Sequence, residues 1–263
     1  MYRRPMTSHV AGSGSILVTG ASSGIGAALA LAYAVPGAVL ELGGRDASRL
    51  EAVAVQCRNR GATVRTAAID VADRTTMADW IADADLSHPL ALVIANAGIS
   101  AGTGDGGESE AQARRIFAVN VDGVLNTVHP AIACMRPRRR GQIALMSSLA
   151  AFRGFPGAPA YCASKAAVRV LGEAMRGELR ADGIGVSVIC PGYVESPMTA
   201  VNRFPMPMLM SAERAAAIIC RGLARDRGRI AFPWPVYAAV RLLAGLPIAW
   251  TDPLLRRLPR KGG

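Results

Sequence analysis

The stretch Ser15-Ile-Leu-Val-Thr19-Gly20-Ala-Ser-Ser-Gly24-Ile-Gly26 decides the fold, and the helical pattern from Ala27 to Tyr33 follows it directly. The apolar run predicts a buried strand, and the glycines that end it predict a tight turn into a helix. Glycines let the backbone approach a pyrophosphate closely, and the free N–H groups at the start of a helix stabilise an anion. Loosely spaced glycines also occur in flexible turns, so the flanking strand and helix are what predict a dinucleotide site here.

Further short apolar runs alternate with helix-length segments along the chain. The predicted strands are Ser15–Thr19, Ala38–Leu42, Thr63–Ala68, Ala91–Ala95, Ile143–Ser147, Val186–Ile189 and Arg229–Phe232. Near-continuous apolar strands joined by helices indicate a parallel sheet covered on both faces. We therefore expect an α/β protein with a single doubly wound Rossmann domain over residues 13–232, a seven-stranded parallel sheet, and a C-terminal extension over residues 233–263.

Two long helices are expected near residues 110–136 and 160–182. The stretch from Pro130 to Arg140, which ends in Arg136-Pro-Arg-Arg-Arg140, closes the first of them. The glycine-rich stretch Gly98–Gly107 is predicted to be a loop.

The composition supports a folded chain. Of the 263 residues, 51% are hydrophobic and 19% are charged, so the chain can bury enough apolar area to offset the entropy lost on ordering. Thirty Lys and Arg against nineteen Asp and Glu give a net charge of +11. That surplus favours phosphate-bearing ligands, nucleic acid or an anionic membrane surface. No nucleic-acid recognition motif accompanies Arg138-Arg-Arg140, so we expect no nucleic-acid partner.

Cysteine usage and the apolar segments indicate a cytoplasmic protein. The five cysteines form no Cys-x-x-Cys pair and the three histidines lie far apart, so neither a disulfide framework nor a metal site is expected. The N-terminus lacks the apolar stretch of a secretory signal. The most apolar long segment, residues 230–250, is interrupted by Arg241 and three prolines, which argues against a membrane-spanning helix.

The end of the second strand bears on the choice of dinucleotide. An acidic side chain there would bond the ribose 2′-hydroxyl of NAD and repel a 2′-phosphate. The sequence reads Leu42-Gly43-Gly44-Arg45, and the guanidinium of Arg45 suits a phosphate, which favours NADP(H) over NAD(H). The alternative is that Arg45 only opens a solvated helix, with Glu41 pointing into the same region.

Tyr161 and Lys165 are four residues apart in a helical pattern, so their side chains leave one face of that helix. An ammonium beside a phenol favours the phenolate and brings the pKa of the tyrosine toward neutral pH. Ser147 and Ser148 end a predicted strand, at the sheet edge where ligands of doubly wound folds bind. Each feature alone has a structural alternative, a chance pair on an amphipathic helix or a turn cap.

These features occur together with others in one order along the chain: Thr19-Gly-x-x-x-Gly24-x-Gly26, Asn96-Ala-Gly98, Asn120, Ser148, Tyr161-x-x-x-Lys165 and Pro191-Gly192. This order resembles the short-chain dehydrogenase/reductase family over roughly residues 13–232. The gap of thirteen residues between Ser148 and Tyr161 fits that family and marks Ser148, not Ser147, as the catalytic serine.

The resemblance implies four catalytic residues. Tyr161 would exchange a proton with the substrate oxygen, and Ser148 would stabilise and orient that oxygen. Lys165 would hold the nicotinamide ribose and lower the pKa of Tyr161, and Asn120 would anchor a water in the proton relay. The implied reaction interconverts a ketone or aldehyde and its alcohol by hydride transfer.

The resemblance also implies a set of cofactor-binding residues. They are Gly20, Ser22, Ser23, Gly24, Ile25, Gly26, Arg45, Asp70, Val71, Asn96, Ala97, Gly98, Tyr161, Lys165, Pro191, Gly192, Val194 and Ser196. Asp70 and Val71 match the adenine contact, Asn96 and Gly98 the ribose region, and Pro191–Ser196 the segment beside the nicotinamide. Ser196 departs from the usual threonine but keeps the hydroxyl. The expected cofactor is NADP(H), with NAD the alternative.

The segment after Gly192 covers the substrate in the resembled family. Here it contains Met198, Phe204, Met206, Met208 and Met210, which favours an adaptable apolar pocket and a hydrophobic substrate, although methionine also fills core gaps. The C-terminal extension combines apolar residues with basic ones. It either lies on an anionic membrane surface or folds over the sheet edge or an oligomer contact.

Two further alternatives concern assembly and activity. Members of the resembled family commonly pair through the helices near 110–136 and 160–182, so we expect a homodimer, with a tetramer as the alternative. A protein that binds NADP(H) for regulation or scaffolding, without turnover, is the rival function, because fold does not prove function.

Overall fold

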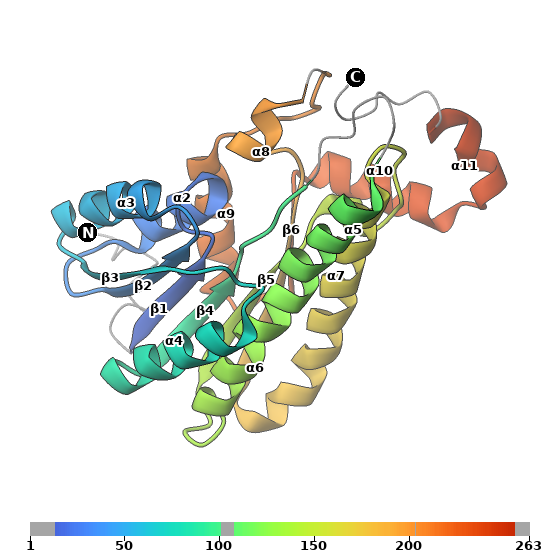
Figure 1. Ribbon diagram of the computed structural model, residues 1–263. Helices are drawn as coiled ribbons and strands as arrows, with labels where there is room; N and C mark the ends of the chain where they lie inside the picture. Colours follow the sequence, from blue (N-terminus) through green and yellow to red (C-terminus); the bar gives the residue numbers. More distant parts are fainter. Residues whose placement is uncertain (1–13, 101–107, 203, 256–263) are drawn as a thin grey trace, which may run out of the picture.

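A computed structural model describes residues 14–100, 108–202 and 204–255, and its centre is a seven-stranded parallel sheet (Figure 1). The strands are β1 (Ser15–Thr19), β2 (Val39–Gly44), β3 (Thr63–Ala68), β4 (Leu90–Ala95), β5 (Gly141–Met146), β6 (Ile184–Pro191) and β7 (Arg229–Phe232). They are hydrogen-bonded in the order β3-β2-β1-β4-β5-β6-β7, and every neighbouring pair is parallel. The strand order reverses between β1 and β4, so the predicted doubly wound α/β fold is confirmed.

The strands lie where the apolar runs predict them, with small differences at their ends. β2 continues to Gly44, which extends it to the residue before Arg45. β5 ends at Met146, so Ser147 and Ser148 lie just beyond the strand at its carboxyl end. Residues 101–107 of the predicted glycine-rich loop lie outside the described part of the chain.

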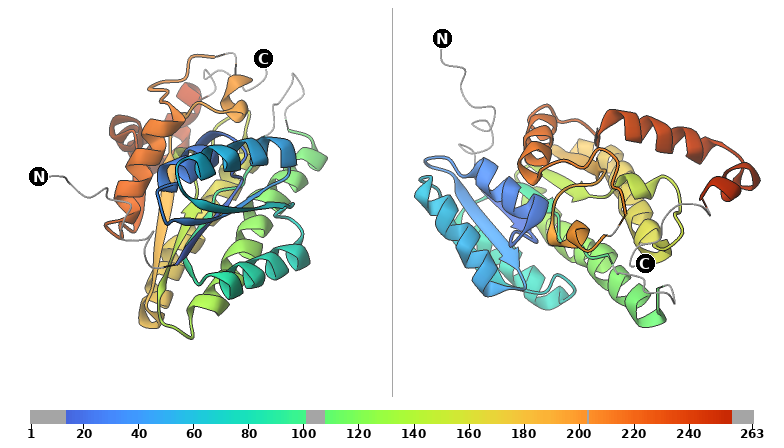
Figure 2. Two further views of the ribbon diagram at one scale, coloured as in Figure 1. Left: turned by 90° about the vertical axis from the view of Figure 1, so that its left-hand side faces the viewer. Right: turned by 90° about the horizontal axis from the view of Figure 1, so that it is seen from above.

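Helices cover both faces of the sheet (Figures 1 and 2). On one face lie α2 (Gly24–Tyr33), α3 (Ala47–Asn59) and α9 (Ala212–Leu223), and on the other α4 (Arg74–Ser87), α6 (Gly123–Met135) and α7 (Pro159–Leu179). Leu29 and Leu50 pack with Leu40 on the first face, and Val128 and Val168 pack on the second. Side chains alternate along each strand, so residues that follow one another on a strand belong to opposite faces.

The helix expected near 110–136 is continuous but contains a change of helix type. α5 (Glu110–Phe117) passes into a π-helical turn, η1 (Ala118–Asp122), which leads directly into α6. α6 runs through Pro130 to Met135, so only the chain from Arg136 onward ends it. Such single π turns occur frequently at functional sites, and this one contains Asn120.

The helix expected near 160–182 is α7, followed by the short 3₁₀ helix η3 (Arg180–Asp182). Another 3₁₀ turn, η2 (Leu149–Ala151), follows Ser148. The segment beyond β6 forms the short α8 (Pro197–Ala200), and the next helix is α9, which Ser211 caps by accepting the N–H of Arg214.

The described part of the C-terminal extension forms α10 (Trp234–Gly245) and α11 (Ile248–Leu255). α10 follows β7, the edge strand, and places Val236 and Tyr237 against the cluster that contains Leu149. Arg153, which follows η2, donates to the Thr251 hydroxyl at 2.6 Å and so holds α11 to the body of the protein. Within the described ranges, none of the helices has the length and hydrophobicity needed to span a bilayer.

Candidate active site

The glycine-rich turn between β1 and α2 has the geometry of an anion site. Gly20 and Gly24 have φ angles of +66° and +52°, in the left-handed region that glycine adopts without strain. A Cβ on Gly26 would lie 2.2 Å from the carbonyl oxygen of Gly20, so a larger residue does not fit there. Ser23 precedes α2 without a side-chain cap bond, which leaves the first-turn N–H groups of α2 available to a phosphate. The turn therefore fits the diphosphate of a dinucleotide.

The end of β4 holds this turn in place. The Asn96 amide donates to the carbonyl oxygens of Thr19 and Gly20, at 2.9 and 3.2 Å. In return, the Thr19 hydroxyl accepts the N–H groups of Asn96 and Ala97, at 3.0 and 3.1 Å. Asn96 and Ala97 thus lie beside the glycine-rich turn, and the Thr19 hydroxyl joins the two strand ends.

The end of β2 also lies beside the turn. A Cβ on Gly44 would be 3.4 Å from the Ser22 side chain, and Ile25 packs into the core from the first turn of α2. Arg45 follows and is exposed to solvent. The adjacent carboxylate of Asp46 is engaged as the N-cap of α3, because it accepts from the backbone N–H and the guanidinium of Arg49, at 2.9 and 2.6 Å.

The alternative that Glu41 points toward Arg45 is wrong. Glu41 is fully buried on the face of the sheet that α4 covers, 3.6 Å from the guanidinium of Arg65. Leu40 and Leu42 pack on the opposite face, so the alternation along β2 turns Glu41 away from the region of Arg45.

Asp70, the expected adenine contact, follows β3 and is held in a network of charges. Its carboxylate accepts the N–H of Ala72 at 3.0 Å and a guanidinium N–H of Arg115 at 2.6 Å. Burial raises the pKa of Asp70, but these two bonds and the charge of Arg45 outweigh burial and bring the pKa below its ordinary value. Val71 is buried against Gly123, where an added Cβ would lie 2.5 Å from it.

Ser148, Tyr161 and Lys165 meet at the carboxyl end of β5. Tyr161 and Lys165 lie one turn apart on α7, and the Lys165 ammonium lies 5.9 Å from the centre of the Tyr161 ring. The Ser148 hydroxyl hydrogen-bonds with the Tyr161 phenol. Ser147 has a structural role. Its hydroxyl donates to the backbone carbonyl of Lys165 at 2.7 Å and fixes α7 to the strand end.

The charges of this group differ from the expectation in one respect. Burial raises the pKa of Tyr161 above its ordinary value, although the bond with Ser148 lowers it, so the free protein holds a protonated phenol. The expected shift of the Tyr161 pKa toward neutral pH is therefore wrong for this state. Burial also lowers the pKa of Lys165 to about 8, because its ammonium, which donates to the Met146 carbonyl at 2.9 Å, lies away from water.

Asn120 reaches the same region from the π turn η1. Its side-chain oxygen accepts the N–H of Ile99 at 2.8 Å, and its amide donates to the Ile99 carbonyl and the Ser164 hydroxyl, both at 3.0 Å. Gly98 lies close to both the Lys165 ammonium and the Asn120 side chain. A Cβ on Gly98 would be 3.1 Å from the ammonium and 3.2 Å from the Asn120 side-chain oxygen. Asn120 and Gly98 thus lie next to Lys165.

The segment from Pro191 to Ser196 closes the site from the side of β6. The Ser148 hydroxyl is 3.5 Å from the Pro191 carbonyl, and Gly192 donates its N–H to Phe232 at 2.7 Å. Ser196 lies at the glycine-rich turn, since a Cβ on Gly24 would be 2.9 Å from the Ser196 Cβ. Val194 is buried and bridges to Met210. All of the predicted site residues therefore lie along the carboxyl ends of β1 to β6.

A model of the short chain dehydrogenase family matches residues 15–205 of this chain. The protein belongs to that family. It is 38% identical to an uncharacterized oxidoreductase of Myxococcus xanthus over 244 residues, which cover 92% of this chain and 96% of the relative. It is 35% identical to an uncharacterized oxidoreductase of Mycobacterium tuberculosis over 237 residues, covering 88% of this chain and 93% of that one.

Solved structures agree with this assignment. A short chain dehydrogenase/reductase from Burkholderia phymatum, solved in complex with NAD, superposes with a TM-score of 0.79 at 25% identity, over 95% of this chain and 97% of its own. Another, from Mycobacterium marinum, gives a TM-score of 0.76 at 26% identity, over 85% of this chain and 94% of its own. This short-chain dehydrogenase is therefore an NAD(P)-dependent oxidoreductase.

The methionines of the segment beyond β6 lie in different environments. Met210 is buried in the core with Val194 and α9, whereas Met208 is 51% exposed. Met198, Met206 and Phe204 are half-buried, and the Phe204 ring contacts that of Tyr193 edge to face at 6.1 Å between centres.

Two residues of this short-chain dehydrogenase were not predicted from the sequence. Tyr193 lies close enough to Tyr161 to raise its pKa, which places a second phenol beside the site. Glu108 accepts the N–H of Ala160 at 2.7 Å and so caps α7, the helix that carries Tyr161 and Lys165. The sequence feature that could have indicated this cap is Ala158, the residue before α7. Alanine has no side-chain acceptor, so the first N–H groups of α7 need an acceptor from elsewhere in the chain.

Proposed function

We propose that this short-chain dehydrogenase uses NADP(H) to interconvert a hydrophobic ketone or aldehyde and its alcohol, with Tyr161 as general acid and base. The observation that carries this proposal is the meeting of the Tyr161 phenol with the Ser148 hydroxyl and the Lys165 ammonium, next to a glycine-rich turn that fits a diphosphate. Asn96, Gly98 and the Pro191–Ser196 segment would hold the ribose and nicotinamide half of the cofactor.

Ser148, Tyr161 and Lys165 have separate roles in carbonyl reduction. The bound nicotinamide supplies the hydride. Ser148 donates a hydrogen bond that orients the substrate oxygen, and Tyr161, kept protonated by burial, gives its proton to that oxygen as the alcohol forms. The nearby ammonium of Lys165 stabilises the phenolate that remains. In alcohol oxidation the same proton moves in the opposite direction.

The preference for a hydrophobic substrate is supported by the segment beyond β6. Tyr193, Met198, Phe204 and Met206 provide aromatic and thioether surface that is half-buried beside the site. The hydroxyls of Ser196 and Thr199 there are engaged in capping α8, whereas a sugar-like substrate needs several convergent hydrogen-bond partners.

A Tyr161→Phe variant tests the proposed proton donor. A screen of hydrophobic ketones and aldehydes, followed by NADPH absorbance, should give turnover for the wild-type protein and a loss of about 10³-fold in kcat/KM for the variant. Tyr237→Phe, which removes a phenol that bonds Arg229 away from the site, is the matched control and should keep its activity. Equal turnover by Tyr161→Phe and wild type would remove the assignment, and NADPH binding without any turnover would favour a binding protein.

An Arg45→Ala variant tests the choice of cofactor. If Arg45 binds the 2′-phosphate, the variant should bind NADPH about 10- to 100-fold more weakly and NADH almost unchanged, because a charge-assisted bond of this kind contributes about 1.5–3 kcal/mol. Arg74→Ala is the control, since Arg74 is also exposed but lies at the start of α4. Equal weakening for both dinucleotides would contradict the preference for NADP(H).

We also propose that the protein is a homodimer, as members of this family generally form oligomers. α5 and α7 lie side by side (Figure 1), and they expose Phe117 and Val170. These apolar side chains suit an isologous interface. The mass of the free protein, measured by light scattering, would be that of two chains.

A further inference from the structure

The outward faces of α10 and α11 are almost entirely apolar. Trp234, Leu242, Ile248 and Trp250 are 73%, 69%, 62% and 74% exposed. Two described residues of these helices carry a charge: Arg241, which is exposed, and Asp252, whose side chain is 44% exposed and lies 3.7 Å from the guanidinium of Arg153. A surface helix normally turns charged residues to the solvent, so this face has the composition of one that is covered by something else.

The inward faces of the same helices already have their partners, so the outward residues are not a displaced core. Val240 and Leu255 are buried, and Tyr237 packs edge to face on Phe152 at 5.4 Å. Arg153 fixes α11 through Thr251. The helices are therefore anchored to the protein by one side and apolar on the other.

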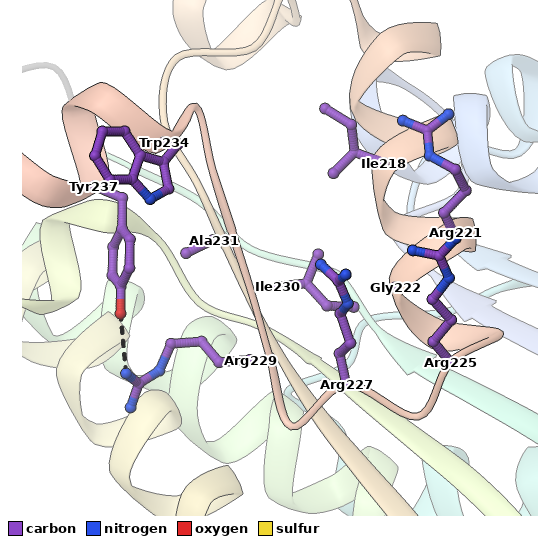
Figure 3. Close-up of a pocket in the computed structure, with 10 residues that line it drawn as sticks. All are labelled: Ile218, Arg221, Gly222, Arg225, Arg227, Arg229, Ile230, Ala231, Trp234 and Tyr237. Carbon is purple, nitrogen blue, oxygen red and sulfur yellow. Dashed lines mark hydrogen bonds between the residues drawn. The ribbon is translucent and has the colours of Figure 1, made fainter.

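A basic pocket adjoins the start of α10 (Figure 3). It is a cavity of about 360 Å³ between α9 and β7, with Arg221 on α9, Arg225 and Arg227 in the turn that follows α9, and the Trp234 ring at its other side. Among the described residues, none of these three guanidinium groups has an ion-pair partner. Arg229, by contrast, is engaged with Glu173 and with the Tyr237 hydroxyl.

The charges and the aromatic residues decide between the possible occupants of this face. Three unpaired guanidinium groups on a chain of net charge +11 select an anionic partner and oppose a second copy that would bring the same arginines. Tryptophans lie at both ends of the apolar stretch, and tryptophan prefers the boundary between lipid headgroups and acyl chains. Seen from above, α9, α10 and α11 follow one another along one side of the molecule (Figure 2).

We propose that α10 and α11, together with the arginine pocket between α9 and β7, dock the protein on a bilayer that contains anionic phospholipid. Trp234, Leu242, Ile248 and Trp250 enter the interfacial layer, and Arg221, Arg225 and Arg227 bind lipid phosphates. After α11 the sequence adds Arg256 and Arg257, which lie outside the described residues and have the same sign of charge. The inference is independent of the oxidoreductase site, because it requires neither cofactor nor substrate.

Vesicle sedimentation with the full chain tests this surface. Wild-type protein should bind vesicles of equal parts phosphatidylglycerol and phosphatidylcholine, and not vesicles of phosphatidylcholine alone. A triple variant, Arg221→Ala with Arg225→Ala and Arg227→Ala, should bind the mixed vesicles on the order of 100-fold more weakly, since each basic residue near the surface contributes about 1 kcal/mol. A Leu242→Glu, Trp250→Glu double variant should lose at least tenfold, because both side chains are exposed and neither supports the fold.

The matched control removes the same charge elsewhere. Arg74, Arg140 and Arg180 are exposed and have no ion pair among the described residues, so their triple replacement by alanine should change vesicle binding less than threefold. All three variants should keep the far-UV circular dichroism spectrum and the thermal unfolding midpoint of the wild-type protein, which shows that they are folded. The proposal is overturned if wild type ignores anionic vesicles or if the control loses as much as the arginine-pocket variant. It is also overturned if Leu242→Glu with Trp250→Glu halves the mass in solution and leaves vesicle binding intact, because the face would then join two copies.

Discussion

Lys165 in the site and Glu41 under α4 are both buried ionisable residues, and their surroundings differ. Lys165 is 3% exposed, and its ammonium donates to the Met146 carbonyl, with no carboxylate among the described residues contributing to its pKa. Glu41 is 0% exposed and has Arg65 at 3.6 Å, yet neither of its oxygens makes a hydrogen bond in the described structure. Burial lowers the pKa of Lys165 and raises the pKa of Glu41, so in both cases it favours the neutral form of the side chain.

The difference shows that burial of a charge alone does not locate an active site. Glu41 lies within β2 between the sheet and α4, where no ligand can reach it, while Lys165 lies beyond the end of β5, beside Tyr161 and Gly98. A perturbed pKa therefore points to function only together with position at the carboxyl edge of the sheet. Under the proposed function the buried ammonium of Lys165 acts in catalysis, whereas the buried carboxyl of Glu41 only costs stability.

The largest expected effect is on Lys165→Met. Activity should fall by at least 10³-fold, because the ammonium that stabilises the phenolate is lost. The free energy of unfolding at pH 7 should rise by about 2 kcal/mol, since a buried ammonium with a depressed pKa opposes folding at every pH below about 8. The gain should shrink as the pH rises from 8 to 10.5, the ordinary value for lysine. Urea denaturation at pH 7 and pH 10 measures it, and a loss of stability at pH 7 would contradict the comparison.

The pH dependence of reduction gives the next effect. The pKa of Lys165 is about 8, so kcat/KM for NADPH-dependent reduction should fall about tenfold per pH unit above that value as the ammonium loses its proton. The raised pKa of Tyr161 keeps the phenol protonated over the same range. The residual activity of Lys165→Met should lack this step near pH 8, and a step that persists in the variant would assign it to another group.

The smallest effect is expected for Glu41→Gln. Burial raises the pKa of the Glu41 carboxyl above 4.5, so its charged form opposes folding at pH 7. Replacing it with neutral glutamine should therefore raise the free energy of unfolding at pH 7 by about 1 kcal/mol. The gain should vanish below pH 4.5, where the carboxyl is protonated in the folded and unfolded chains alike. Turnover and the preference between NADPH and NADH should stay within twofold of wild type. A change in that preference would place Glu41 at the cofactor after all.

Most of the fold could be predicted from the sequence because the strands are buried on both faces and appear as short apolar runs. The direction of Glu41 was also readable, since it alternates with Leu40 and Leu42, whose apolar side chains mark the opposite face. The π turn at Ala118–Asp122 was not readable, because a single extra residue in so short a segment cannot be told from ordinary irregularity in the apolar spacing.

The site residues came from a linear order of motifs, and the structure adds how they are held. Thr19 and Ser147 are ordinary polar residues in the sequence, and only the packing of β1 against β4 and of β5 against α7 gives their hydroxyls a partner. The methionines beyond β6 have no period from which burial can be inferred, so the separation of Met210 from Met206 depends on the tertiary contacts of α9.

Because of the π turn, the number of residues between α5 and α6 affects the geometry of the site. The turn joins α5 to α6 with one residue more than a regular helix of the same span would need. Deleting a residue from Ala118–Asp122 would restore regular winding and rotate α5 by about 100° relative to α6. Asn120 would then lose the two bonds to Ile99 that now align its amide. The orientation of Asn120 therefore depends on chain length at this point as much as on which amino acid occupies it.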